Sequence, residues 1–240
     1  MNQPYKLTPM HAWHTQNGAQ TSVVDGWVRV LAYGDSQAEI QATNSDVGIC
    51  DVSPLSKIDI QGKRSGALLE ESAGMPVPGV GGCASLMLRG CPKPVYVVRL
   101  HSEKYLVLAA ANLREQVYSL LAEAAREHDC VHTTDVTSAY AALQVAGPKA
   151  VALLKKLGSA PIDQIQTEHC VQTSTARVWS VVIHHQARQG SAWLVLVSRD
   201  FGEYVWETVL VAGQEFGIRP FGISAAKVIT GMEEIDVATL

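Results

Sequence analysis

One short stretch of the sequence has side chains that could hold a metal ion. His128, Cys130 and His132 recur at every second position, which would place all three on one face of an extended strand. Zinc takes such ligands, but it needs a fourth partner or a water site, and no paired cluster is evident. The alternative is a helix end that runs into a surface turn. We therefore expect no metal.

The other histidines and cysteines lack the geometry that catalysis needs. The adjacent pair His169 and Cys170 would point to opposite faces of an extended segment, whereas a nucleophile and its base must converge. His11 and His14 fall on a possible helix in a polar arm, with no third ligand nearby. Residues 184–185, both histidines, lie beside a predicted hairpin turn and are expected to face solvent.

The glycine-rich segment 74–82 is a loop by its composition, but it is not typical of a phosphate-binding loop. No Lys-Ser or Lys-Thr pair follows it, and no helix start is apparent. The sequence also contains no nucleophile elbow, no HExxH motif and no Walker motif. The residues alone therefore predict no catalytic residue.

The elements that would position any site are written twice in the chain. Segments 51–69 and 135–154 both open Asp-Val-Ser/Thr and run through an alternating strand into a glycine turn. The turn glycines are Gly62 and Gly147, and a helix with a Leu-Leu pair follows each of them. Pro148 is expected at the first helical position, where its missing N–H is tolerated. The pattern predicts an internally duplicated α+β fold.

Similar patterns extend both copies, and we expect pseudo-repeats at about 47–128 and 131–217 within one domain, 1–240. Alternation and helical spacing predict further elements in each copy. The predicted strands are 27–33, 84–88, 95–100, 105–109, 178–183 and 193–197, and the predicted helices are 36–44, 112–127, 148–157 and 201–216, with Val117, Leu120, Leu121 and Ala124 facing the core. The tail 220–240 shows no pattern beyond a possible short strand.

The composition is that of an ordinary globular protein. The 240 residues carry 18% charged side chains and a net charge of −4 without a basic block, which argues against a nucleic-acid partner. No apolar run is long enough to span a membrane, and the N-terminus lacks the plan of a signal peptide. The five cysteines have no CxxC spacing and are expected to be reduced, in the cytoplasm.

Three segments carry a resemblance to a known family. Residues 48–53 read Gly-Ile-Cys-Asp-Val-Ser, residues 143–150 contain Leu-x-Val-x-Gly-Pro-Lys-Ala, and residues 219–222 read Arg-Pro-x-Gly. In this order they resemble the glycine cleavage T-protein (aminomethyltransferase) family. The resemblance implies a T-protein-like folate-binding fold of two packed α+β units, without the family's C-terminal barrel domain. It also implies that tetrahydrofolate accepts a one-carbon unit in a central opening.

The resemblance implies a folate site at Leu55, Lys93 and Tyr96. The sequence differs from the family, however, at the motifs that carry its catalytic residues. A paired Asp-Asp of the enzymes falls on residues 91–94, Cys-Pro-Lys-Pro. Other family signatures fall on Ala110, 190–194 and 229–233, where they are absent or reduced to fragments. The carboxylate of the enzymes is replaced here by Lys93, which has the opposite charge, or by Pro94, which has none. The resemblance therefore implies no catalytic residue.

A second resemblance concerns residues 192–206, which are similar to the small gamma subunit of heterotetrameric sarcosine oxidase. It implies a subunit, non-catalytic or folate-binding, of an assembly in one-carbon metabolism that oxidises methylated amines, with a larger flavoprotein or a second copy as partner. The alternative is a tetrahydrofolate-dependent aminomethyl- or methyltransferase with an altered active site. A third reading is a folate-binding protein without turnover.

The apolar tail 221–240 is expected to lie at the partner interface, and the alternative is a terminal strand that folds back. The residues on which the interface reading depends are Ile223, Val228, Ile229, Met232 and Ile235.

Overall fold

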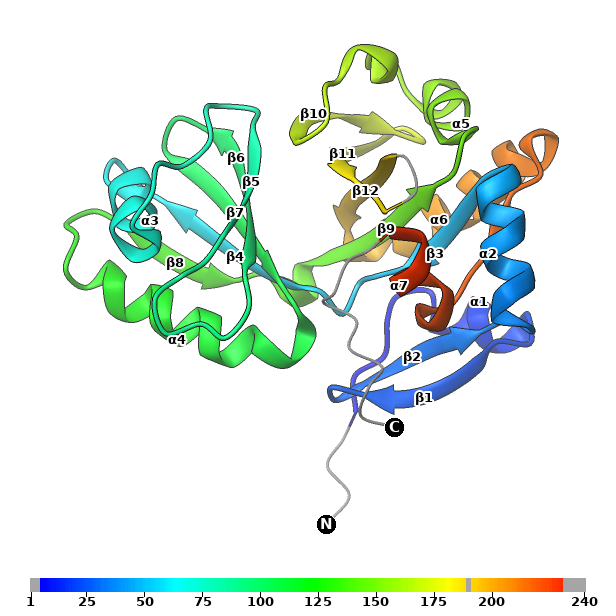
Figure 1. Cartoon of the computed structure of the whole chain (residues 1–240), viewed down its shortest axis with the longest axis horizontal. Helices are drawn as coiled ribbons and strands as arrows, with labels where there is room; N and C mark the ends of the chain where they lie inside the picture. The colour runs from blue at the N-terminus through cyan, green and yellow to red at the C-terminus, as the bar shows by residue number, and fades with distance from the viewer. Residues whose placement is uncertain (1–4, 189–190, 231–240) are drawn as a thin grey trace. The chain divides into compact units, whose positions relative to one another are not determined.

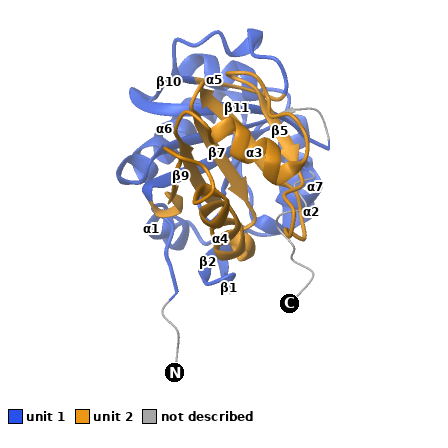
Figure 2. Cartoon of the chain, turned by 90° about the vertical axis from the view of Figure 1, so that its left-hand side faces the viewer, with its two compact units in different colours: residues 1–54, 139–167, 172–240 blue, residues 55–138, 168–171 orange. Residues whose placement is uncertain are grey.

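The structure is a computed structural model that describes residues 5–188 and 191–230 (Figure 1). The chain forms two compact units, coloured separately in Figure 2. Unit 1 comprises residues 1–54, 139–167 and 172–240, and unit 2 comprises residues 55–138 and 168–171. No helix among the described residues is long and apolar enough to cross a membrane.

Unit 2 is an antiparallel sheet covered by helices on one face. Its strand order is β5-β6-β7-β4-β8. The bounds are β4 (Ser56–Gln61), β5 (Cys83–Leu86), β6 (Val95–His101), β7 (Lys104–Ala109), β8 (His132–Asp135), α3 (Ser65–Ala73), the 3-10 turns η1 (Ala111–Leu113) and η2 (Thr137–Ala139), and α4 (Arg114–Ala125). In Figure 2, α3 and α4 lie in front of this sheet.

The core of unit 2 forms because alternate strand residues point to the side that the helices cover. Ile58 and Ile60 of β4 are fully buried there with Leu68 and Leu69, the Leu-Leu pair of α3. The predicted core face of α4 is confirmed. Its buried residues are Val117 and Leu121, with Leu120 and Ala124 packed at the edge of the cluster.

Unit 1 contains a sheet of order β10-β11-β12-β9-β3-β13 and a separate hairpin. The sheet is built from β3 (Gly48–Asp51), β9 (Tyr140–Ala146), β10 (His169–Thr175), β11 (Val178–Gln186), β12 (Ser191–Ser198) and β13 (Arg219–Pro220). The first three residues of β10, 169–171, belong to unit 2. The hairpin is β1 (Gln20–Val24) with β2 (Trp27–Ala32). The helices are α1 (His11–Gln16), α2 (Ser36–Ser45), α5 (Ala150–Leu157), α6 (Gly202–Gly213) and α7 (Ile223–Thr230), and the 3-10 turns are η3 (Ile162–Gln164), η4 (Arg199–Phe201) and η5 (Gln214–Phe216).

The two larger sheets share one pattern of pairing. β3 opens the first copy of the repeated motif and pairs with β9 of the second, while β8 opens the second copy and pairs with β4 of the first. The turn glycines also correspond: Gly62 has φ +133° and packs against the Cys130 carbonyl, and Gly147 has φ +110° and packs against the Thr43 and Asp46 carbonyls. These features support duplication, and superposition of the two halves stays a prediction.

The starts of helices α2 and α5 are set by different local interactions. Asp35 caps α2, because its carboxylate accepts the Gln37 and Ala38 backbone N–H groups. Pro148 is not helical, since a turn closed by the Ala150 N–H on the Gly147 carbonyl delays the start of α5.

The predicted end of α5 at Gly158 is correct, but the physical reason is close packing. Gly158 has an extended backbone rather than a left-handed one. A Cβ at this position would lie 2.4 Å from the Ser174 carbonyl oxygen.

The tail differs from both expectations. After β13, which is parallel to β3, the chain forms helix α7 rather than a terminal strand. Phe221, Ile223 and Ile229 are buried, so the prediction that they form a partner interface is wrong. Val228 is exposed, and the further tail residues Met232 and Ile235 lie outside the described residues.

The predicted hairpin turn at residues 184–190 also begins too early. β11 continues to Gln186, and His185 is buried within it. His184 stacks on Trp193 with ring centroids 4.0 Å apart, and its Nδ1 lies 2.7 Å from the Ile165 carbonyl oxygen. The prediction that these two histidines face solvent is therefore wrong.

Candidate functional site

The three residues expected to contact folate lie in unit 2. Leu55 is buried just before β4, Lys93 is half-buried in the turn before β6, and Tyr96 is half-buried in β6. β7 separates β4 from β6, so Leu55 and Tyr96 are not on neighbouring strands. Their role in binding stays a prediction.

The strand register reveals a further residue on the sheet face opposite the helices. Lys57, Leu108 and Tyr96 are paired in one row across β4, β7 and β6, so their side chains share a face. Lys57 is fully buried, and its Nζ donates to the Leu55 carbonyl at 2.8 Å. Sequence reasoning missed Lys57, although the alternation Lys-Ile-Asp-Ile at 57–60 already places it opposite the apolar residues.

Tyr96 contacts a carboxylate that the sequence analysis also missed. Its hydroxyl donates to Glu168 Oε2. Burial raises the pKa of Tyr96, and the neighbouring Cys83 and Glu168 raise it further, so the hydroxyl keeps its proton. The Cys83 N–H donates to the Glu168 carbonyl at 2.7 Å, which fixes the backbone beside this side chain. We call Cys83, Tyr96, Glu168 and Cys170 the Tyr96 cluster.

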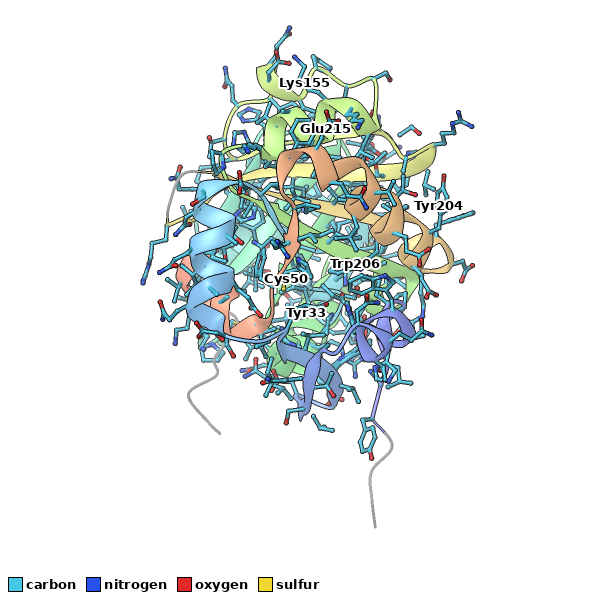
Figure 3. The ribbon with its side chains drawn as sticks, turned by 90° about the vertical axis from the view of Figure 1, so that its right-hand side faces the viewer. Tyr33, Cys50, Lys155, Tyr204, Trp206 and Glu215 are labelled. Atoms are coloured by element: carbon cyan, nitrogen blue, oxygen red, sulfur yellow. The ribbon has the colours of Figure 1, made fainter. Side chains whose placement is uncertain are left out.

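A second polar group lies in the core of unit 1. His14 Nε2 is 3.0 Å from Asp51 Oδ2, and His14 Nδ1 is 2.7 Å from the Tyr33 hydroxyl. The imidazole therefore donates from Nε2 to the carboxylate, and its Nδ1 shares a hydrogen bond with the Tyr33 hydroxyl. Trp206 packs edge-on against His14 with centroids 5.0 Å apart; Tyr33 and Trp206 are labelled in Figure 3. The expectation that His14 belongs to a polar arm is wrong, because its side chain is buried.

Burial and hydrogen bonding determine the protonation of Asp51 and Tyr33 in this group. Burial alone would raise the pKa of Asp51, but hydrogen bonds from His14 and Ser53 hold it below its ordinary value. Burial raises the pKa of Tyr33, with a further contribution from the charge of Asp51. Asp51 thus stays ionised and accepts the hydrogen bond from His14, while Tyr33 stays protonated.

A pocket of about 650 Å³ lies beside this group in unit 1, between Trp13, Tyr33 and Arg219. Its two carboxylates are already used by the fold. Asp35 caps α2, and Glu39 accepts the Tyr33 and Gly222 N–H groups. The pocket therefore offers aromatic walls and a guanidinium, but no carboxylate available for general acid–base chemistry.

The residues considered for metal binding are separated by a turn. α4 ends at Ala125, His128 is buried with Nε2 3.3 Å from Glu71 Oε2, and Cys130 is exposed at φ +60°. In the part of the chain that the structure describes, no group of three or more His, Cys, Asp or Glu side chains is placed to hold a metal ion.

Comparisons with known proteins agree with the fold. The family model described as the GCVT N-terminal domain matches residues 10–233. The aminomethyltransferase of Streptomyces avermitilis is 28% identical over 223 residues, which is 90% of this chain and 60% of that protein. The chain thus spans about 60% of the length of this relative.

Two solved structures share the fold at low identity. The glycine cleavage system aminomethyltransferase T from Bartonella henselae superimposes with a TM-score of 0.82 at 17% identity, covering 92% of this chain and 60% of that one. A chain of the heterotetrameric sarcosine oxidase from Corynebacterium sp. U-96 gives a TM-score of 0.61 at 21% identity, covering 76% of this chain and 92% of that one. With the family match over nearly its whole length, the chain belongs to the family described as the GCVT N-terminal domain.

Proposed function

We propose that this protein is a T-protein-fold subunit that binds reduced folate and performs no group transfer by itself. Its place is in an assembly that oxidises methylated amines, beside a larger partner. The family membership supports a folate-related role. The match to 92% of one chain of a heterotetrameric oxidase supports the role of a subunit.

The observation that carries the proposal is the turn before β6. The resemblance implies that the family's acidic pair precedes this strand, and β6 begins at Val95. The preceding residues 91–94 contain Lys93 and no carboxylate. A lysine there favours the neutral form of a bound amine and cannot accept its proton, so the acid–base step has no base at this position.

The residues of the Tyr96 cluster suit part of a folate. The pterin ring is planar and carries adjacent N–H donors, and a carboxylate such as Glu168 has four lone-pair sites, so it can accept from both Tyr96 and a ligand. Leu106 and Leu108 lie on the same sheet face as Tyr96 and Lys57. When bound, tetrahydrofolate would supply the acceptor nitrogens for a one-carbon unit, and these residues would orient the ring.

Binding is tested by titrating the purified chain with tetrahydrofolate under anaerobic conditions, followed by calorimetry. We expect saturable binding by the wild-type protein. Glu168→Gln is expected to weaken it about tenfold or more, because a charge-assisted hydrogen bond to the ring is lost. Glu103→Gln is the matched control, since Glu103 is an exposed glutamate of unit 2 and should leave the affinity unchanged. The absence of any saturable binding to the wild-type protein would contradict the proposal.

The alternative function is a tetrahydrofolate-dependent aminomethyl- or methyltransferase with a relocated acid–base group. The contact between Glu168 and Tyr96 is the observation in its favour, because it provides a half-buried carboxylate where the sequence predicts none. In that case the wild-type chain would turn over, and Glu168→Gln would lower kcat on the order of a hundredfold. Loss of affinity without any turnover would instead support the folate-binding subunit.

A further inference from the structure

Two cysteines from distant parts of the sequence are brought together in unit 2. Gly82 and His169 form an isolated antiparallel bridge. The Cys83 N–H donates to the Glu168 carbonyl at 2.7 Å, and the Cys170 N–H donates to the Gly81 carbonyl at 2.8 Å. Cys83 therefore directly follows Gly82 on one segment, and Cys170 directly follows His169 on the other.

This register places both thiols on one face. Side chains alternate along an extended segment, so the residues that follow Gly82 and His169 both point away from the face of the bridged pair. Cys83 lies opposite Glu168 and Cys170 lies opposite Gly81, so the two cysteines are diagonal neighbours on that face, and each shifts the pKa of the other. Cys83 is buried, whereas Cys170 is half-buried, with its Sγ 3.9 Å from the Arg99 carbonyl oxygen.

The interaction between the two thiols also shifts their pKa values in opposite directions. The hydrogen bond that Cys83 donates lowers the pKa of Cys170, although burial opposes the shift. Cys83 keeps its proton, because that bond and then burial raise its pKa. Cys170 is thus the better nucleophile and the more accessible one, since the thiolate is the reactive form.

We propose that Cys83 and Cys170 form an oxidisable dithiol, a modification site at which a hydroperoxide converts the pair to an intramolecular disulfide. Both thiols belong to the Tyr96 cluster, but the inference does not rest on folate binding or turnover, since it is argued from the placement of the two thiols.

The reaction balances in two steps. The Cys170 thiolate attacks one peroxide oxygen, the O–O bond breaks, and the products are a Cys170 sulfenic acid and hydroxide. The Cys83 sulfur then attacks the sulfenic sulfur, the S–O bond breaks, and the Cys83 proton leaves with that oxygen as water. Overall the two sulfurs lose two electrons, which the two peroxide oxygens gain.

The other cysteines supply controls within the same chain. Cys130 is exposed and lies after α4, while Cys50 and Cys91 are buried. Exposure alone would make Cys130 the first to react, and burial alone would protect Cys83. The proposal instead requires that the buried Cys83 be oxidised together with Cys170, which no ranking by exposure predicts.

The test treats the full chain with hydrogen peroxide at neutral pH, blocks remaining thiols, and maps peptides without reduction. The expected result is a peptide that links residues 83 and 170, a loss of two hydrogen masses from that pair, and full reversal by dithiothreitol. Cys130→Ser should leave this product unchanged. Cys83→Ser should abolish it and leave Cys170 to proceed to sulfinic acid.

Two results would overturn the proposal. One is oxidation of Cys170 to sulfinic acid in the wild-type chain while Cys83 stays reduced. The other is a disulfide that joins Cys130 of two copies while the Cys83 and Cys170 thiols survive. Because the map of the wild-type protein decides between these outcomes, failure of the Cys83→Ser variant to fold would not affect the conclusion.

Discussion

Replacing Asp51 with alanine is expected to lower the free energy of unfolding by about 3–5 kcal/mol. The carboxylate is buried and accepts from His14 Nε2 at 3.0 Å and from the Ser53 N–H at 2.9 Å. Its removal leaves the N–H of the buried imidazole, which packs edge-on against Trp206, without its acceptor. Denaturant titration followed by circular dichroism measures the change.

The same substitution should change the dependence of stability on pH. The folded-state pKa of Asp51 lies below its ordinary value of 3.8. Its contribution is therefore complete above that value and is lost as the pH falls through the folded-state pKa. The difference in stability between wild type and Asp51→Ala should shrink only below about pH 4.

The matched control is Asp163→Ala, which removes a surface ion pair with Lys155. Exposed pairs of this kind contribute little, so the unfolding midpoint should remain close to that of the wild type. If Asp51→Ala were no more destabilising than Asp163→Ala, the hydrogen bonds to His14 would not anchor unit 1.

Gly62→Ala is expected to destabilise the protein by about 2–4 kcal/mol, through backbone strain and overpacking together. Gly62 has φ +133°, and a Cβ there would lie 1.8 Å from the Cys130 carbonyl oxygen. The obstacle is backbone, so it cannot rotate away as a flexible side chain would. The measurement is the unfolding midpoint in denaturant.

Gly26→Ala separates the two causes of that loss. Gly26 also has a positive φ, +74°, but a Cβ there would meet nothing within 4 Å. It should therefore cost only about 1 kcal/mol, the strain of a left-handed backbone. Equal losses in the two variants would show that the contact with Cys130 is not the constraint at Gly62.

The sequence predicted elements whose signals are local. Alternation located β4, β6, β7 and β9. The repeated motif also led to Gly62 and Gly147, whose positive φ values explain why the pattern needs glycine there. The resemblance, confirmed by the family match, supplied the fold family, which periodicity alone could not.

The site residues were harder to predict because they meet through long-range pairing. Glu168 lies 72 positions from Tyr96 in the sequence, and His14 lies 37 positions from Asp51. No local spacing signals either contact. Sequence reasoning judged Cys170 only against its neighbour His169, whereas the register of the bridge at Gly82 decides its actual partner.

The most direct test of the central claim is a turnover assay on the isolated chain. The purified protein, saturated with tetrahydrofolate, is incubated with an aminomethyl donor, and transfer of the one-carbon unit to tetrahydrofolate is measured. The account predicts binding without product formation above the uncatalysed rate, because residues 91–94 supply no base. Product formation that persists in Lys93→Ala and disappears in Glu168→Gln would contradict it and establish the enzyme instead.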